Sequence, residues 1–110
     1  MATTPNDLLQ GTLGLLVLRA LRDESRHGWG IQQRINQIAQ DALSVNQGSL
    51  YPALIRLEKQ TLIKSKWGTS DAGRRAKFYS LTAKGRRQME KETEIWKQFS
   101  DTIDLILHSI

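Results

Sequence analysis

The sequence has no cysteine and only two histidines, His27 and His108, among its 110 residues. Without cysteine there are no disulfides and no thiolate metal ligands. Two isolated histidines leave almost no side chains that exchange protons near neutral pH, so hydrolytic triads and histidine metal sites are nearly excluded. A glycine-rich phosphate loop, paired metal-ligand spacings and a nucleophile beside a base are also missing. An enzyme is therefore the weakest class, and we expect a binding protein with no cofactor and no metal.

Long apolar runs are missing as well. The longest, residues 13–18, is interrupted by Gly14 and is far shorter than the roughly 20 residues of a membrane span. Asn6, Asp7 and Gln10 stand where a signal peptide would be apolar. Apolar residues nevertheless make up 39% of the chain and charged residues 25%, which is ordinary for a folded domain. We expect one globular unit in the cytoplasm, with no membrane partner.

The positive charge of the chain is concentrated in one segment. The formal net charge is +5, yet residues 1–55 are neutral overall and residues 92–110 carry a net charge of −3. Residues 56–91 hold eleven basic and three acidic side chains, a net charge of +8. Such clustering indicates a localised basic surface for an anionic partner, although a solvated face with chance clustering is the simpler alternative.

Apolar residues at helical spacing predict helices over residues 8–22 and 27–39, with His27 in a structural role at the turn between them. Three leucines at the same spacing predict a third helix, whose start is open because Pro52 has no N–H to donate. If Asn46 caps this helix, Pro52 disturbs its second turn; if Ser49 caps it, Pro52 falls in the first turn, where the missing N–H costs nothing. Residues 43–45 fit either a one-bridge strand or an extended linker.

Alternation of side chains predicts two strands over residues 62–67 and 76–81, joined by the turn formers of residues 69–75. We expect Trp67 and Phe78 to pack in the core beneath this hairpin. Thr82 can then cap one helix that runs from Ala83 almost to the C-terminus, about 40 Å in length at 1.5 Å per residue.

Three helices followed by a hairpin is the order of a winged helix-turn-helix, in which the third helix enters the DNA major groove and the hairpin is the wing. The predicted fold is therefore mainly α with a small β-hairpin, a winged helix-turn-helix plus a long C-terminal helix. Residues 1–82 would form the DNA-binding part and residues 83–110 the dimerisation helix of one compact unit. The basic segment begins on the third helix and continues through the wing, so charge and topology agree.

Five strings of the sequence resemble the PadR family of bacterial transcriptional regulators, and they come in family order over nearly the whole chain. They are GTLGLLVLRAL, HGWGI, NQGSLYPALIRLEKQTLI, GRRAKFYSLTAKGR and the following Trp96. Trp29 stands where relatives often carry tyrosine, and the single C-terminal helix is similar to the short subfamily. The resemblance implies a homodimeric repressor of a nearby operon.

Candidate DNA contacts follow from the fold. On the third helix, glutamine can pair with adenine, serine with a base or a phosphate, and the tyrosine hydroxyl with a phosphate, whereas arginine there is better placed for phosphates. In the wing, arginines can enter a narrow minor groove and lysines can serve phosphates. Asn46 has a second interpretation as a helix cap, and Tyr51 as a core residue with its hydroxyl at the surface. The predicted DNA-binding residues are Asn46, Gln47, Ser49, Tyr51, Arg56, Lys64, Lys66, Arg74, Arg75 and Lys77.

Apolar residues recur in the last helix with the heptad spacing of a coiled-coil seam, interrupted by Glu92. A helix this long should pair with its copy in a homodimer; the alternative is that the stripe packs wholly on its own domain. The predicted dimerisation residues are Met89, Trp96, Phe99, Ile103, Ile106 and Ile110. In some members of the family the dimer interface accepts planar aromatic compounds, which makes Trp96 a candidate effector platform as well as an ordinary interface residue.

The leading hypothesis is a sequence-specific DNA-binding regulator, a homodimeric repressor on a pseudo-palindromic operator in double-stranded DNA, released by a small planar aromatic effector. The alternative is a winged-helix interaction module whose basic face binds an acidic protein or an anionic surface.

Overall fold

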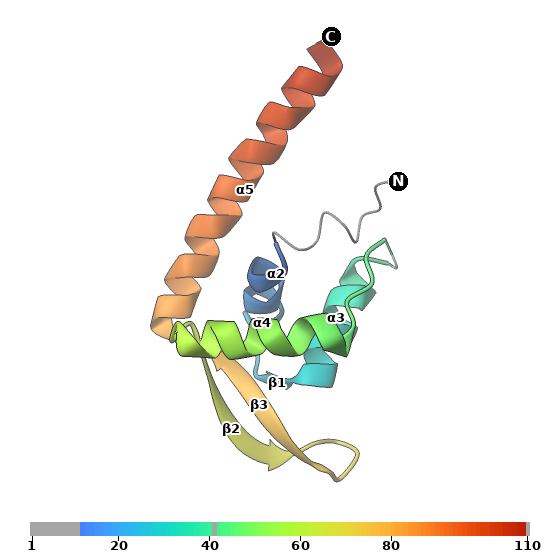
Figure 1. Ribbon diagram of the computed structural model, residues 1–110, viewed down its shortest axis with the longest axis vertical. Coiled ribbons are helices and arrows are strands. Elements are labelled where there is room, and N and C mark those ends of the chain that lie inside the picture. Colours follow the sequence, from blue (N-terminus) through green and yellow to red (C-terminus); the bar gives the residue numbers. More distant parts are fainter. Residues whose placement is uncertain (1–11, 41, 110) are drawn as a thin grey trace.

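The computed structural model describes residues 12–40 and 42–109, and it confirms the predicted winged helix-turn-helix with a long C-terminal helix (Figure 1). The longest dimension, 54 Å, follows that helix and the wing. Within the described residues, no helix is both long and apolar enough to cross a membrane. The elements are α2 (Leu13–Ala20), β1 (Arg26–His27), α3 (Gly28–Ile38), α4 (Gln47–Lys59), β2 (Ile63–Thr69), β3 (Arg75–Leu81) and α5 (Ala83–Ser109).

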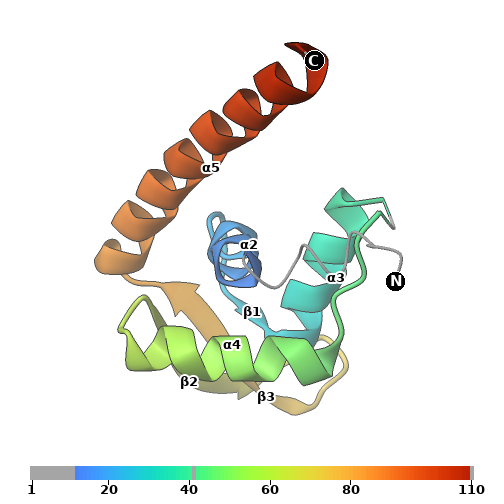
Figure 2. The ribbon, with the colours of Figure 1, turned by 45° about the horizontal axis from the view of Figure 1, so that its top comes forward.

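The core lies where α2, α3 and α4 meet above the sheet. Figure 2 shows α2 nearly end-on between α5 and α3, with α4 running across beneath it. Leu18, Ile31, Leu50 and Leu54 are fully buried there, one to two from each helix. Each such side chain contributes about 1.5–3 kcal/mol by leaving water. Of the predicted helix at residues 8–22, the structure shows residues 13–20, and residues 8–11 lie outside the described part.

His27 starts α3 and joins it to the wing. Its Nδ1 accepts a hydrogen bond from the Gly30 N–H at 2.9 Å and so caps the helix. Arg26 and His27 also pair with Tyr79 and Phe78 of β3, which makes the sheet three-stranded in the order β1-β3-β2. The structural role expected of His27 is confirmed. Strand β1 was not predicted, because two residues are too few to show alternation.

The start of α4 is decided in favour of Asn46. Its Oδ1 accepts from the Ser49 N–H at 2.9 Å, and the helix begins at Gln47. The alternative cap at Ser49 is wrong, and Pro52 lies in the second turn, where it leaves the Gly48 carbonyl without a helical donor. The helix nevertheless continues to Lys59 because its apolar face is buried along its whole length.

Residues 43–45 form the extended linker, not a strand. Two side chains of α3 make the hydrogen bonds to the linker backbone that a neighbouring strand would otherwise make. The Val45 N–H donates to Asn36 Oδ1 at 2.9 Å, and the Val45 carbonyl accepts from Gln32 Nε2 at 2.8 Å and from Asn36 Nδ2 at 3.2 Å. These bonds fix the position at which α4 begins.

The wing corrects the prediction for Trp67. Strands β2 and β3 pair antiparallel with Ser65 opposite Tyr79 and Trp67 opposite Lys77. Tyr79 is buried, whereas Trp67 is 57% exposed and Phe78 is half-buried against the His27 ring, 5.3 Å between centroids. The strands alternate as predicted, but the core residue of β3 is Tyr79, and Phe78 lies on the opposite face with Lys64 and Lys66, so the expectation of a core position is wrong for Phe78 too. The hairpin also extends beyond the helices (Figure 1), so Trp67 has no core above it.

Helix α5 begins in a tight contact with the turn that follows α4. Thr82 caps α5 by accepting from the Gly85 N–H at 2.9 Å, as predicted, and its hydroxyl donates toward the carbonyls of Thr61 and Leu62 at 2.7 and 3.1 Å. Gly85 lies directly on this turn. A Cβ at residue 85 would be 1.9 Å from the Leu62 carbonyl oxygen. The glycine is therefore required by packing.

We predict that Gly85→Ala lowers the free energy of unfolding by about 2–3 kcal/mol, because the Leu62 backbone must move to admit the methyl group. Urea denaturation followed by circular dichroism measures the change. Gly14→Ala is the matched control, since a Cβ there would make ordinary contacts at 3.7 and 3.8 Å and alanine favours the helix by about 1 kcal/mol. Equal stabilities of the two variants would contradict this account of residue 85.

Candidate nucleic-acid interface

Helix α4 presents one side to the core and the other to solvent. Leu50, Ala53, Leu54 and Leu57 are buried. The exposed residues come from the remaining positions and include Gly48, Ser49, Tyr51, Pro52, Ile55, Arg56 and Lys59. Figure 1 shows the wing beside α4, and Glu58 on one flank of the helix contacts Ser65 and Lys77 of the two strands.

Two of the predicted reader residues are held by neighbouring groups. Asn46 is occupied as the cap of α4, as its second interpretation had it. The Gln47 amide donates to Gln32 Oε1 on α3, and Gln32 in turn donates to the linker at Val45. A side chain fixed in this way has a defined direction, but fewer free groups to pair with a base.

The other three α4 residues lie at the surface in different directions. Ser49 is exposed. Tyr51 is half exposed, and its hydroxyl lies against Gly28 at the start of α3, 3.4 Å from where a Cβ would be. The Arg56 guanidinium lies on the opposite flank, 3.8 Å from the Cβ position of Gly14 on α2. The structure thus places Tyr51 on the flank of α3 and Arg56 on the flank of α2.

The wing lysines fall on two faces. Lys64 and Lys66 are exposed on the face that also carries Phe78. Lys77 is on the other face, where its Nζ lies 3.6 Å from Glu58 Oε1 of α4. Ser65 donates to the second oxygen of the same carboxylate at 2.5 Å. Lys77 is therefore already paired, and Lys64 and Lys66 are the freer charges.

Tyr79 lies beside this carboxylate. Burial raises the pKa of the Tyr79 phenol, and the nearby Glu58 carboxylate raises it further. The ring therefore stays neutral and serves as core packing under the wing, with the Lys77 ammonium 5.9 Å from its centroid.

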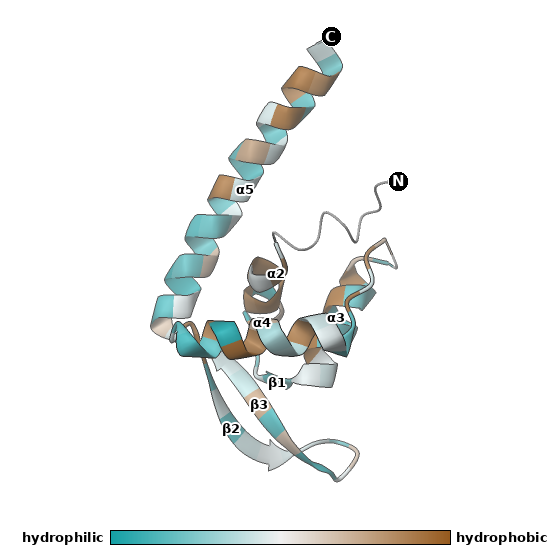
Figure 3. Ribbon diagram, in the orientation of Figure 1, coloured by the Kyte–Doolittle hydropathy of each residue, from teal (hydrophilic) through white to brown (hydrophobic). Residues whose placement is uncertain are grey.

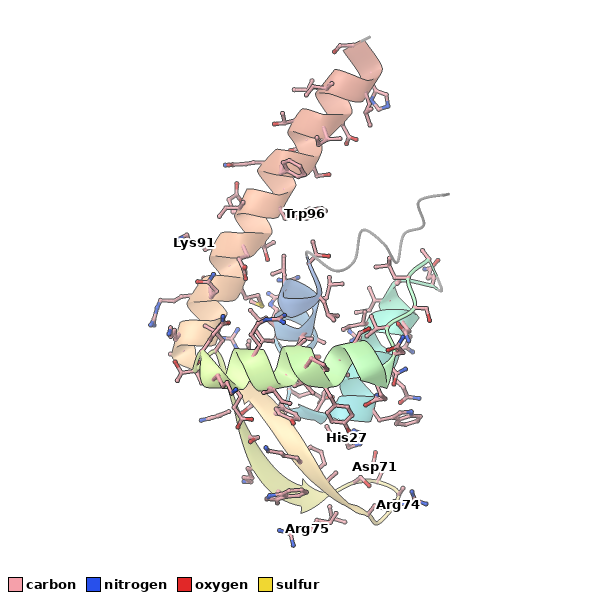
Figure 4. All side chains as sticks on the ribbon, viewed as in Figure 1. His27, Asp71, Arg74, Arg75, Lys91 and Trp96 are labelled. Carbon is pink, nitrogen blue, oxygen red and sulfur yellow. The ribbon has the colours of Figure 1, made fainter. Side chains whose placement is uncertain are left out.

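At the tip of the wing, Arg75 is stacked on Trp67 with its guanidinium carbon 4.8 Å from the ring centroid. The turn is closed by hydrogen bonds of 2.8 Å between Ser70 and Arg74 and between Gly73 and Ser70, and Gly73 has the positive φ of 77° that such a turn requires. Figure 4 shows Arg74, Arg75 and Asp71 together at this tip. The indole holds the Arg75 guanidinium in an extended position beside the hairpin.

A groove of about 1270 Å³ runs between α3 and the wing. Sequence reasoning missed it, because its walls come from segments that are distant in the chain. Trp29 is the residue that could have been noticed, since it stands on the polar side of α3 and is exposed. The walls include Trp29, Arg34, Tyr51, Trp67, Arg75 and Phe78.

The predicted dimerisation residues separate into two groups. Met89 is 1% exposed and belongs to the core of its own domain, so it is not available to a partner subunit. Trp96, Phe99, Ile103 and Ile106 are 37–54% exposed, and the rings of Trp96 and Phe99 lie 5.8 Å apart. Figure 3 shows the apolar segments gathered in the half of α5 nearer the C-terminus. Ile110 lies outside the described residues.

Among residues 12–40 and 42–109, no three histidine, aspartate or glutamate side chains come together as metal ligands. What the surface does offer is cations, exposed aromatic rings and a projecting helix.

Comparison with known proteins relates this arrangement to a family. The sequence pattern of the transcriptional regulator PadR-like family matches residues 17–91. The chain belongs to the PadR-like family. Its winged domain is thus that of a transcriptional regulator, and the implied activity is regulation through DNA binding. The PadR-like relatives are transcriptional regulators rather than enzymes.

Solved structures of transcriptional regulators share the fold. A transcriptional regulator from Clostridium thermocellum superposes with a TM-score of 0.80 at 26% identity, over 89% of this chain and 95% of that one. A PadR-like transcriptional regulator from Bacillus cereus superposes with a TM-score of 0.79 at 30% identity, over 91% and 95% of the two chains. An uncharacterized protein of Lysinibacillus sphaericus is 26% identical over 105 residues, 96% of each chain.

We predict that Lys66→Met lowers the slope of log affinity for duplex DNA against log salt by about 0.9, the value of one phosphate contact. Lys77→Met should lower it by less than half as much, because Lys77 is paired with Glu58. Fluorescence anisotropy over a range of salt concentrations measures both slopes.

Lys91→Met is the control, since Lys91 lies on α5, away from the wing (Figure 4). The slope of log affinity against log salt for Lys91→Met should equal that of the unchanged protein. Equal losses for Lys66→Met and Lys77→Met would show that the ion pair with Glu58 does not withhold Lys77 from DNA.

Proposed function

We propose that this PadR-like regulator is a homodimeric repressor that binds a pseudo-palindromic operator through α4 and the wing. The observation that carries the proposal is the joint surface of α4 and the wing, where Lys64, Lys66, Arg74 and Arg75 are exposed in a chain of this family. Cations on this surface supply affinity for any duplex through counterion release. The neighbouring helix supplies the side chains that distinguish one sequence from another. An operator-binding protein of this kind would act in the cytoplasm.

The dimer is supported by the exposed apolar stripe of α5. Monomeric proteins seldom leave large neighbouring apolar side chains in water. Trp96, Phe99, Ile103 and Ile106 are all in this state although Met89, at the base of the same helix, is buried in its own domain. The alternative that the stripe packs wholly on its own domain therefore finds no support beyond Met89. The seam offered to a second copy starts at Trp96.

A two-fold dimer has consequences for the operator. Each copy would present one α4 and one wing, so the two half-sites would be related by the same two-fold axis. Half-sites in such complexes are separated by about one or two helical turns, roughly 34 Å each. Repression follows directly if the operator overlaps a promoter, since an occupied site blocks the polymerase.

A planar aromatic effector would bind where the two copies of α5 meet. Trp96 is half exposed, and its neighbour Phe99 gives a second ring at 5.8 Å on the same side of the helix. Two such pairs facing each other across the dimer would sandwich a flat ligand, with about 0.5–1.5 kcal/mol for each stacked pair beyond burial. Occupation of the seam would alter the distance between the two reading helices and thereby release the operator.

Selection from a random DNA pool tests the DNA-binding part of this proposal. We predict that the full chain enriches a pseudo-palindromic sequence, and that the enriched duplex resists competition by heparin. Affinity should fall steeply between low and physiological salt, since several phosphates are contacted. An interaction module with an acidic protein or an anionic surface as its partner would enrich no sequence and would release DNA to heparin.

Substitutions on α5 test the dimer. We predict that Ile103→Asp converts the dimer to monomers in sedimentation velocity at micromolar concentration, because an unpaired carboxylate would be buried in the seam. Leu105→Asp is the matched control. Leu105 is 68% exposed and lies about 200° around the helix from residue 103, so this variant should remain dimeric. An intact Ile103→Asp dimer would overturn the proposed seam.

A further inference from the structure

The exposed side of α4 has an outer ridge formed by Gly48, Pro52, Ile55 and Lys59, which follow one another at intervals of three or four residues. This ridge lies opposite the buried leucines of the same helix. It is therefore the part of α4 farthest from every element packed against it.

The flanks of the ridge confirm this orientation. Tyr51 leans toward Gly28 of α3, and Glu58 bonds Ser65 of the wing. On the other flank Arg56 leans toward α2. If α4 enters the major groove of DNA as proposed, the outer ridge is what reaches the base edges at the floor of the groove.

The chemistry of the ridge is unusual for a reading helix. From Gly48 to Ile55 it carries no hydrogen-bonding side chain, and Ile55 is 56% exposed, with the exposed cations Arg56 and Lys59 next to it along the helix. An apolar side chain cannot distinguish donors from acceptors. Among the base edges in the major groove, thymine presents an apolar group, its C5 methyl.

We propose that Ile55, beside Pro52, reads the C5 methyl groups of thymines in the operator. The inference rests on the proposed DNA-binding function and assigns a specificity determinant that the polar residues do not provide. Charge complementarity favours DNA over an apolar protein as the occupant of this surface. Lys59 ends the ridge one turn after Ile55, and Arg56 lies on its flank, both exposed, so a duplex that contacts Ile55 also meets these cations.

The polar residues at the start of α4 leave the ridge free to approach the bases. Gln47 is held by Gln32, so it offers a single defined direction at the edge of the helix. Pro52 has no N–H and only a compact ring, so its side chain does not project past that of Ile55. Close approach to thymine methyl groups then requires no polar group to lose its water without a partner.

Uracil substitution gives the test. A duplex enriched from the random pool by the unchanged protein is resynthesised with thymine replaced by uracil, one position at a time. Each change removes one methyl group and keeps the base pairing. We expect one or two positions in a half-site at which binding weakens about fourfold, the loss that one methyl-sized apolar group predicts.

The same duplexes are then measured with Ile55→Ala. The loss on uracil substitution should fall to less than twofold at those positions, because the side chain that contacts the methyl group is gone. Ile38→Ala is the matched control. Ile38 is 62% exposed on α3, and its variant should keep the fourfold loss. Circular dichroism checks that both variants remain folded.

The outcomes separate the two proposals. If the unchanged protein enriches no sequence, the proposed function fails. If it enriches an operator but every uracil duplex shows the same loss with Ile55→Ala as with the unchanged protein, DNA binding stands and the assignment of Ile55 is overturned.

Discussion

The Leu62 carbonyl is the point on which the arrangement of this protein depends. It accepts hydrogen bonds from the Thr82 N–H at 3.2 Å and from the Thr82 hydroxyl at 3.1 Å, and Gly85 packs directly on it. Leu62 lies between the end of α4 and the start of β2, while Thr82 lies between the end of β3 and the start of α5. Helix α4, the wing and α5 therefore diverge from one junction. Their mutual angles are set there, by contacts too close to admit a single extra methyl group.

This junction carries backbone strain and compensates for it locally. Thr61 has a φ of 59°, in the left-handed region, which costs a side-chain-bearing residue about 1–2 kcal/mol. The turn satisfies the end of α4, since Leu62 donates to Leu57 and Thr61 to Glu58, both at 3.0 Å. Lys84, from the first turn of α5, donates to the Gln60 carbonyl at 2.9 Å. The start of α5 thus caps the end of α4, so the orientation of one copy's α5 is transmitted to the helix that would meet DNA.

Periodicity was enough to predict the helices and the hairpin, because burial of one face repeats over many residues. It could not predict which residues are buried where this depends on how far an element extends past its neighbours. Trp67 has the alternation of a core residue, but the wing extends past the helices and leaves it exposed. Met89 has the heptad spacing of the seam, but it lies on the first turns of α5 and is buried in its own domain. Strand β1, with two residues, has no period at all.

The polar residues of the interface show a division between affinity and specificity. Several groups that could bind DNA are tied to neighbours, as Lys77 is to Glu58 and Gln47 to Gln32. Such bonds reduce the number of donors that are free to pair with DNA. They also hold the surface side chains in one conformation before DNA arrives, so these side chains lose less conformational entropy on binding. The exposed cations of the wing attract any duplex, and their contribution weakens with salt. Under the proposed function, sequence preference would come from α4, whose outer ridge is apolar and whose position is fixed at both ends, by Asn36 through the linker and by Lys84 through the junction.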